Sequence, residues 1–131
     1  MGQHLTVVLD ASAILALLLD EPGGDAVAAA SIGSVVCSVN VAEVAERLHR
    51  SFESEAVRAS MAAALPQTIA ADHELAVAAG LMRETTRSSG LSLGDRFCLA
   101  LAQRLGCPVL TADRAWLEYE TALGIQVQLI R

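Results

Sequence analysis

The sequence predicts an α/β fold, a three-layer α/β/α sandwich around a parallel five-stranded sheet. Short apolar runs rich in β-branched residues alternate along the chain with longer runs rich in Ala and Leu at helical period. This alternation is typical of successive βα units, whose strands lie parallel. The 131 residues are the length of one domain with a substantial core. We therefore expect a single domain over residues 1–131.

The apolar β-rich runs predict five strands, at 5–9 (LTVVL), 34–38 (SVVCS), 67–70 (QTIA), 108–111 (PVLT) and 125–129 (IQVQL). The Ala- and Leu-rich runs predict helices at about 11–19, 24–30, 41–52, 55–65, 72–87, 93–105 and 113–122. The turn-forming stretch DEPGGD separates the first two helices, and RSSGLSLGD separates the fifth from the sixth.

Composition excludes several classes of protein. The apolar run ILALLL is far shorter than the roughly 20 residues that a membrane span requires. The start of the chain carries no basic segment typical of a signal peptide, so we expect a cytoplasmic protein. Cys37, Cys98 and Cys107 are odd in number and show no zinc-site spacing, which indicates free thiols in a reducing compartment.

The charge balance limits how the chain can bind nucleic acid. A net charge of -6 and a pI near 4.9 argue against a protein that coats nucleic acid electrostatically. Any phosphate contact must therefore be local. The chain contains no lysine, so all nine basic residues are arginines.

Asp10 is a single carboxylate between the apolar runs LTVVL and ASAILALLL. A charged group in such surroundings must be compensated or functional. The structural alternative is that Asp10 caps the helix that follows, because its oxygen can accept backbone N–H bonds from the first turn.

Three further carboxylates occupy similar positions. Glu43 and Asp95 are predicted in the first turns of helices, and Asp113 follows the fourth strand. Capping is again the alternative, with Asn40 and Glu43 as a capping box, Ser92 and Asp95 as a shorter analogue, and Asp113 as an N-cap. Ends of parallel strands open on one edge of the sheet, where ligands bind. Carboxylates gathered there repel one another and require a cation, and an all-oxygen site suits Mg²⁺ or Mn²⁺.

The stretches VVLDASAIL, CSVNVAEV, LSLGDRFCLALA and VLTADRAW resemble the four acidic motifs of PIN-domain ribonucleases. The order of the motifs and the chain length are similar to those of the VapC-type toxins of type II toxin-antitoxin systems. This resemblance places the acidic site on Asp10, Glu43, Asp95 and Asp113. It also places supporting hydroxyl groups on Ser12 and Thr111.

The resemblance implies a metal-dependent endoribonuclease whose products carry 5′-phosphate and 3′-hydroxyl ends. A divalent metal would activate water and stabilise the phosphoryl group. We expect Asp10 and Asp95 as direct ligands, and Asp113 as a ligand directly or through water. We also expect these three to share one ion. Glu43, on the opposite wall, would hold a second ion or orient the attacking water.

Four arginines are candidates for contacts with RNA phosphate. Arg47 and Arg50 follow Glu43 on the same side of its predicted helix, and Arg96 and Arg114 each follow a site acid. The alternative is that these arginines pair with Glu46, Glu84 or Glu118 on a solvated face. His49 and His73 lie in polar helical stretches and are expected on the surface.

Two other classes of protein fit part of the pattern. A PIN-like fold could serve only as a binding module, with its acids retained as caps. A Mg²⁺-dependent phosphatase or receiver domain also places acids at strand ends, but Asp10 lacks the second acid of these families and the chain lacks their lysine. The toxin family also implies an antitoxin partner and a homodimer. The apolar stretches at 26–33 and 55–65 are expected to contribute to a partner surface.

Overall fold

The structure is a computed structural model that describes residues 6–131. All five predicted strands are present and form one parallel sheet of order β3-β2-β1-β4-β5. The strands are β1 (Val7–Leu9), β2 (Ser34–Cys37), β3 (Gln67–Ile69), β4 (Val109–Thr111) and β5 (Val127–Leu129). Residue 5, at the start of the first predicted strand, lies outside the described residues.

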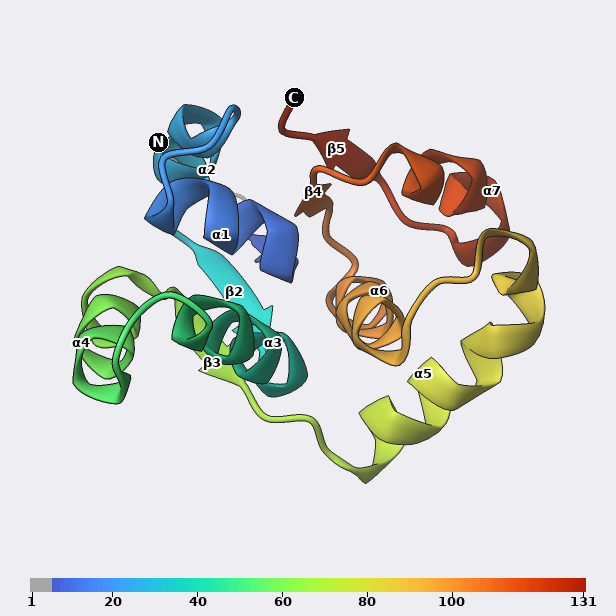
Figure 1. Cartoon of the computed structure of the whole chain (residues 1–131). Coiled ribbons are helices and arrows are strands. Elements are labelled where there is room, and N and C mark those ends of the chain that lie inside the picture. Colours follow the sequence, from blue (N-terminus) through green and yellow to red (C-terminus); the bar gives the residue numbers. More distant parts are fainter. Residues whose placement is uncertain (1–5) are drawn as a thin grey trace.

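Helices cover both faces of this sheet (Figure 1). One layer contains α1 (Ala11–Leu18), α2 (Gly24–Ala30), α3 (Ser38–His49) and α4 (Ser54–Ala64). The other contains α5 (His73–Thr85), α6 (Leu93–Leu105), α7 (Glu120–Leu123) and the 3-10 helix η2 (Arg114–Tyr119). A 3-10 turn, η1 (Arg87–Ser89), follows α5. The predicted three-layer α/β/α sandwich is confirmed.

The three central strands β1, β2 and β4 are buried on both faces, whereas the edge strands β3 and β5 carry exposed polar residues. In β1, Val7 and Leu9 pack in the core beneath α1 to α4, whereas Val8 packs in the core beneath α5 to α7. A parallel sheet covered on both sides gives this continuous apolar pattern. The described residues include no helix long and apolar enough to cross a membrane.

Two predicted helices differ in their limits. The helix predicted over 41–52 begins at Ser38, directly after β2, so Glu43 lies in its second turn and not in its first. The helix predicted over 113–122 is divided into η2 and α7. The Asp113 side chain accepts a hydrogen bond from the Ala115 amide, two residues on, which matches the tighter winding of a 3-10 helix.

The strand order reverses between β1 and β4. From β1 the chain continues through β2 to β3 on one side of the sheet, and β4 and β5 lie on the other side. Leu9 pairs with Leu110, so Asp10 and Thr111 come next at the carboxyl ends of adjacent strands. Such a switch point is where open parallel sheets bind their ligands.

Candidate active site

Asp10 has the capping role that the sequence offered as an alternative. It is the N-cap of α1, where its Oδ1 accepts a hydrogen bond of 2.8 Å from the Ala13 amide. Ser12 Oγ donates to the same Oδ1 at 2.7 Å, and Thr111 Oγ1 donates to Oδ2 at 2.7 Å. The side chain is therefore a cap that is also held in place from β4.

The hydroxyl groups of Ser12 and Thr111 connect Asp10 to the segment that carries Asp113. The Ala112 amide donates to Ser12 Oγ and the Asp113 amide donates to Thr111 Oγ1, each at 3.0 Å. Each hydroxyl thus donates to Asp10 and accepts from the backbone after β4. This arrangement sets the position of the first acid relative to the fourth.

Asp10 is buried without a counter-charge. Its residue is 5% exposed, and burial raises the pKa of its carboxyl to about 6, although the bonds from Ser12, Thr111 and Ala13 lower it and the charge of Asp95 raises it further. No arginine or histidine within residues 6–131 forms an ion pair with it. A cation would relieve this cost of burial.

The Glu43 side chain is held by Asn40, which the sequence predicted to be a helix cap. Asn40 is the third residue of α3 and is 1% exposed, so it does not form the predicted capping box. Its Nδ2 donates to Glu43 Oε1 at 2.7 Å and to the Gly94 carbonyl at 3.0 Å. Asn40 therefore positions Glu43 and joins α3 to the start of α6. Local sequence patterns could not predict this role, because Asn40 and Gly94 are 54 residues apart in the chain.

Gly94 allows the Glu43 carboxylate to lie against α6. A Cβ atom at this position would overlap all three atoms of that carboxylate group. The Gly in LSLGD is thus required by a close approach between α3 and α6. Burial raises the pKa of Glu43, the bond from Asn40 lowers it, and the charge of Asp95 raises it.

Asp95 is electrostatically central to the four acids. It forms the predicted capping box with Ser92, with Asp95 Oδ2 accepting from the Ser92 amide at 3.0 Å. Burial raises the pKa of Asp95, the bonds from Ser92 lower it, and the charge of Asp113 raises it. The charge of Asp95 in turn raises the pKa values of Asp10 and Glu43. The structure therefore brings the four acids together around the first turn of α6.

Asp113 is exposed and caps η2 through the Ala115 amide at 3.0 Å. Glu43, Asp95 and Asp113 accept hydrogen bonds from their own segments, whereas Asp10 also accepts one from Thr111 on β4. No three Asp, Glu, His or Cys side chains within residues 6–131 are arranged to hold a metal ion. That Asp10, Asp95 and Asp113 share one ion stays a prediction. Their hard oxygen donors and uncompensated burial fit Mg²⁺ or Mn²⁺.

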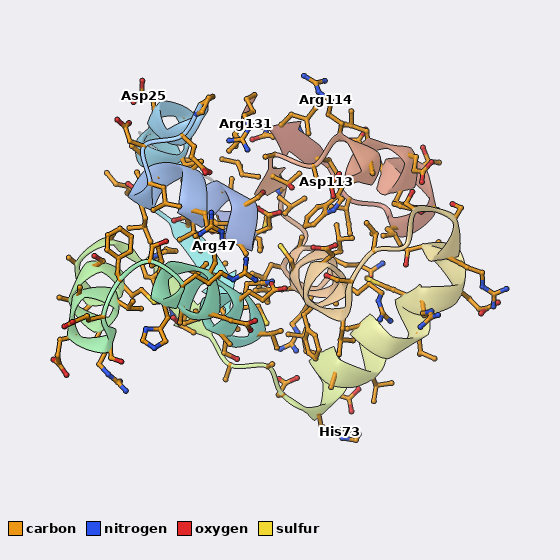
Figure 2. The ribbon with its side chains drawn as sticks, viewed as in Figure 1. Asp25, Arg47, His73, Asp113, Arg114 and Arg131 are labelled. Atoms are coloured by element: carbon orange, nitrogen blue, oxygen red, sulfur yellow. The ribbon has the colours of Figure 1, made fainter. Side chains whose placement is uncertain are left out.

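The four candidate arginines lie in different surroundings. Arg47 is half-buried on the side of α3 that faces α1 and α6 (Figure 2), and Arg50 is exposed at the end of α3. Neither forms an ion pair within the described part of the chain, so the expected alternative of pairing with Glu46 is wrong.

Arg96 and Arg114 do not point at the acids. Arg96 is buried and donates to the carbonyls of Ala79 and Ser92, towards α5. Arg114 donates to the carbonyl of Arg131 and lies at the edge of the molecule beside β5 (Figure 2). Phosphate contacts by Arg96 and Arg114 stay a prediction.

The histidines and cysteines agree with expectation. His49 and His73 are exposed. All three cysteines are free thiols, with Cys37 and Cys98 buried and Cys107 half-buried.

Comparisons with known proteins show the family and the fold of the chain. The PIN domain family model matches residues 7–121. No curated protein sequence matches the chain. A DNA-bound VapBC structure from Salmonella typhimurium has a TM-score of 0.76 at 17% identity and covers 97% of this chain and 99% of its own.

Two other solved structures show the same fold. VapBC2 from Rickettsia felis, bound to a promoter DNA fragment, has a TM-score of 0.72 at 11% identity, with 95% of this chain and 98% of that chain covered. VapBC-5 from Mycobacterium tuberculosis, a toxin-antitoxin system, has a TM-score of 0.60 at 23% identity, with 97% and 98% covered. With most of its length matched by the family model and its fold shared with these structures, the chain belongs to the PIN domain family.

Proposed function

We propose that this PIN domain protein is a Mg²⁺- or Mn²⁺-dependent endoribonuclease, a hydrolase that cleaves RNA at phosphodiester bonds. The observation that carries the proposal is the gathering of four carboxylates at the switch point of the sheet, with Asp10 buried and lacking a counter-charge. An uncompensated carboxylate cluster in a ligand-binding crevice fits a metal-dependent site.

The proposed roles of the residues are those of metal ligands and of groups that orient them. A divalent ion, when bound, activates water and stabilises charge on the phosphoryl group. Asp10 and Asp95 would hold it directly and Asp113 directly or through water, while Glu43 would hold a second ion or orient the attacking water. Ser12 and Thr111 fix the orientation of the Asp10 carboxylate. The proposed products carry 5′-phosphate and 3′-hydroxyl ends.

The proposal includes a partner. Solved structures with this fold include a toxin-antitoxin complex from Klebsiella pneumoniae and a member of the VapBC family of toxin-antitoxin systems. We therefore propose that the chain is the toxin of such a pair, acts on RNA in the cytoplasm and forms a homodimer. The apolar stretches expected to contribute a partner surface correspond to α2 and α4, and Ile32 beside α2 is 65% exposed. Light scattering of the purified chain would test the homodimer by its mass.

RNA cleavage tests the proposed activity. Wild-type protein is expected to cleave single-stranded RNA with Mg²⁺ or Mn²⁺ and to lose this activity in EDTA, while Asp10→Asn is inactive with metal present. Sequencing RNA 5′ ends after brief expression would identify the cleavage sites. Cleavage at full rate in excess EDTA would exclude the mechanism. RNA binding without cleavage under every metal condition would instead support the binding-module alternative, whereas the family match leaves no support for a phosphatase or receiver domain.

A further inference from the structure

A pocket lies beside Asp95 and has no role in the chemistry above. It has a volume of about 310 Å³ and lies between the end of α5, the loop after it and the start of α6. Three arginines line it: Arg83, Arg87 and Arg96. The remaining wall contains Thr86, Gly90, Leu91, Ser92 and Leu93. The lining is thus rich in positive charge and contains no aromatic ring.

Arg96 is the buried arginine of this pocket. It is 8% exposed, and its Nη1 and Nε donate to the carbonyls of Ala79 and Ser92 at 3.1 and 3.4 Å. These acceptors are neutral, and no carboxylate within residues 6–131 forms an ion pair with Arg96, although its charge lowers the pKa of the neighbouring Asp95. A buried guanidinium without a direct ion pair is costly. An anion in the pocket would supply that pair.

The rest of the pocket also favours an anion. Arg83 is exposed and has no ion-pair partner among the described residues, while Arg87 pairs with the exposed Glu84 at 2.5 Å. The three arginines therefore outnumber the two acids beside them, Glu84 and Asp95. Ser92 and Leu93 are the N-cap and first residue of α6, a helix of 13 residues, so the positive end of its dipole lies at the pocket wall.

The pocket and the acid site share the first turn of α6. Ser92 lines the pocket and bonds to Asp95, which belongs to the acids. We propose that the pocket binds a backbone phosphate of the RNA substrate, on the strand that passes the acid site. Guanidinium groups match phosphate oxygens in geometry and charge, and such contacts position a strand without reading its sequence. The inference rests on the proposed ribonuclease function.

Binding of inorganic phosphate tests the pocket without RNA. In the full-length protein at constant ionic strength, added phosphate is expected to shift the Nε–H resonances of Arg83 and Arg96 to saturation in NMR spectra. Arg58 on α4, which forms no ion pair within residues 6–131, is the control and should not shift. Equal small shifts of all three arginines would overturn the proposed site.

RNA binding then tests the assignment to the substrate. The affinity for single-stranded RNA is measured by titration in the presence of Mg²⁺. Two proteins are compared, Asp10→Asn, which is expected to leave the RNA uncleaved, and the double variant that also carries Arg83→Gln. Loss of one phosphate contact is expected to weaken binding about tenfold and to reduce the slope of log affinity against log salt by about 1. Arg58→Gln should change neither quantity. Arg83 is exposed, so its variant is expected to fold even if Arg96→Gln does not.

The outcomes separate the two proposals. Wild-type cleavage of RNA together with unchanged affinity and salt slope in Arg83→Gln would overturn the pocket and leave the ribonuclease proposal standing. Saturable shifts of Arg96 with phosphate, in a protein that neither binds nor cleaves RNA, would overturn the assignment to RNA and leave a site for free phosphate. A lower RNA affinity and a lower salt slope in Arg83→Gln, with both unchanged in Arg58→Gln, support the pocket as an RNA phosphate site.

Discussion

Asp10 both caps α1 and carries a charge that the fold does not neutralise. The sequence offered capping and metal binding as alternatives for Asp10. In the structure its carboxylate accepts hydrogen bonds from the Ala13 amide and from two hydroxyl groups. The cap explains how its position is set, and burial explains its raised pKa. The two roles are therefore compatible, and their energetic consequences can be separated by pH.

The stability of the metal-free protein is expected to fall as pH rises from about 4 to about 6. The pKa of Asp10 rises from 3.8 to about 6 on folding, so the folded state binds more protons between these values. The stabilisation is complete below the lower pKa and lost above the higher one. The loss amounts to about 3 kcal/mol from a shift of this size.

Urea unfolding in EDTA at pH 4 and pH 7 measures this effect. Asp10→Asn keeps a capping side chain but cannot ionise, so its stability relative to wild type should increase between these pH values. Asp25→Asn, at an exposed position on α2 (Figure 2), is the control and should follow the wild-type curve. Parallel curves for wild type and Asp10→Asn would show that Asp10 is not the group responsible.

Gly94→Ala is expected to reduce RNA cleavage at least tenfold without loss of stability. The added Cβ would displace the Glu43 carboxylate, and small displacements of active groups are costly to catalysis. The fold should tolerate the change, because the displaced group ends a flexible side chain and Ala is the better helix former. Cleavage rates and urea unfolding are measured together.

Gly80→Ala provides the matched control for this substitution. It makes the same change within α5, where a Cβ would meet no atom within 4 Å. It should leave cleavage unchanged. Equal activity of the two variants would show that the position of Glu43 does not matter to the reaction.

At the scale of elements, the acid site depends on the contact between α3 and α6. Asn40 bonds to Glu43 on its own helix and to the Gly94 carbonyl at the start of α6. Ser92 and Asp95 fix that start through their capping box. Two helices from opposite layers of the sandwich thus hold two of the acids in one arrangement.

Asn40→Ala is expected to lower the free energy of unfolding by about 1–3 kcal/mol, because it removes a buried amide and leaves the Gly94 carbonyl without this donor. It should also lower RNA cleavage, since Glu43 loses its anchor. Urea unfolding and cleavage rates test both effects at a temperature where each variant is folded.

Gln103→Ala is the control that separates the loss of stability from the loss of cleavage. Its Nε2 donates to the Leu123 carbonyl at 2.9 Å, so this variant loses a comparable bond between elements away from the acids. It should lower stability and leave cleavage intact. If Asn40→Ala cleaves RNA as well as Gln103→Ala does, Asn40 has only a structural role.

At the scale of the whole molecule, metal binding is expected to stabilise the folded chain. The acids come from α1, α3, α6 and the start of η2, so an ion held by them links both helical layers. Saturating Mg²⁺ should raise the melting temperature of the wild type by mass action, and that of Asp10→Asn by clearly less. Equal shifts in the two proteins would indicate that Asp10 holds no metal.

Much of the fold follows from local patterns along the chain. The five strands and the places of the helices are predictable because buried parallel strands are continuously apolar and their connecting helices keep a helical period. The caps at Asp10, Ser92 and Asp113 are predictable for a similar reason, since each involves residues at most three apart. Acids that directly follow parallel strands are then expected at one edge of the sheet, because the carboxyl ends of the strands meet there.

The contacts that shape the site were decided only by the tertiary structure. Asn40 resembles a cap in the sequence, but packing of α3 against α6 buries it and gives it the Gly94 carbonyl as a partner. Arg96 follows a site acid yet turns towards α5, and Arg114 turns towards the C-terminal residue. The sequence by itself determined the sheet, its helices and the four acids, because these depend on neighbouring residues. The directions of Asn40, Arg96 and Arg114 depend on groups 17 to 54 residues away, which only packing brings within hydrogen-bond distance.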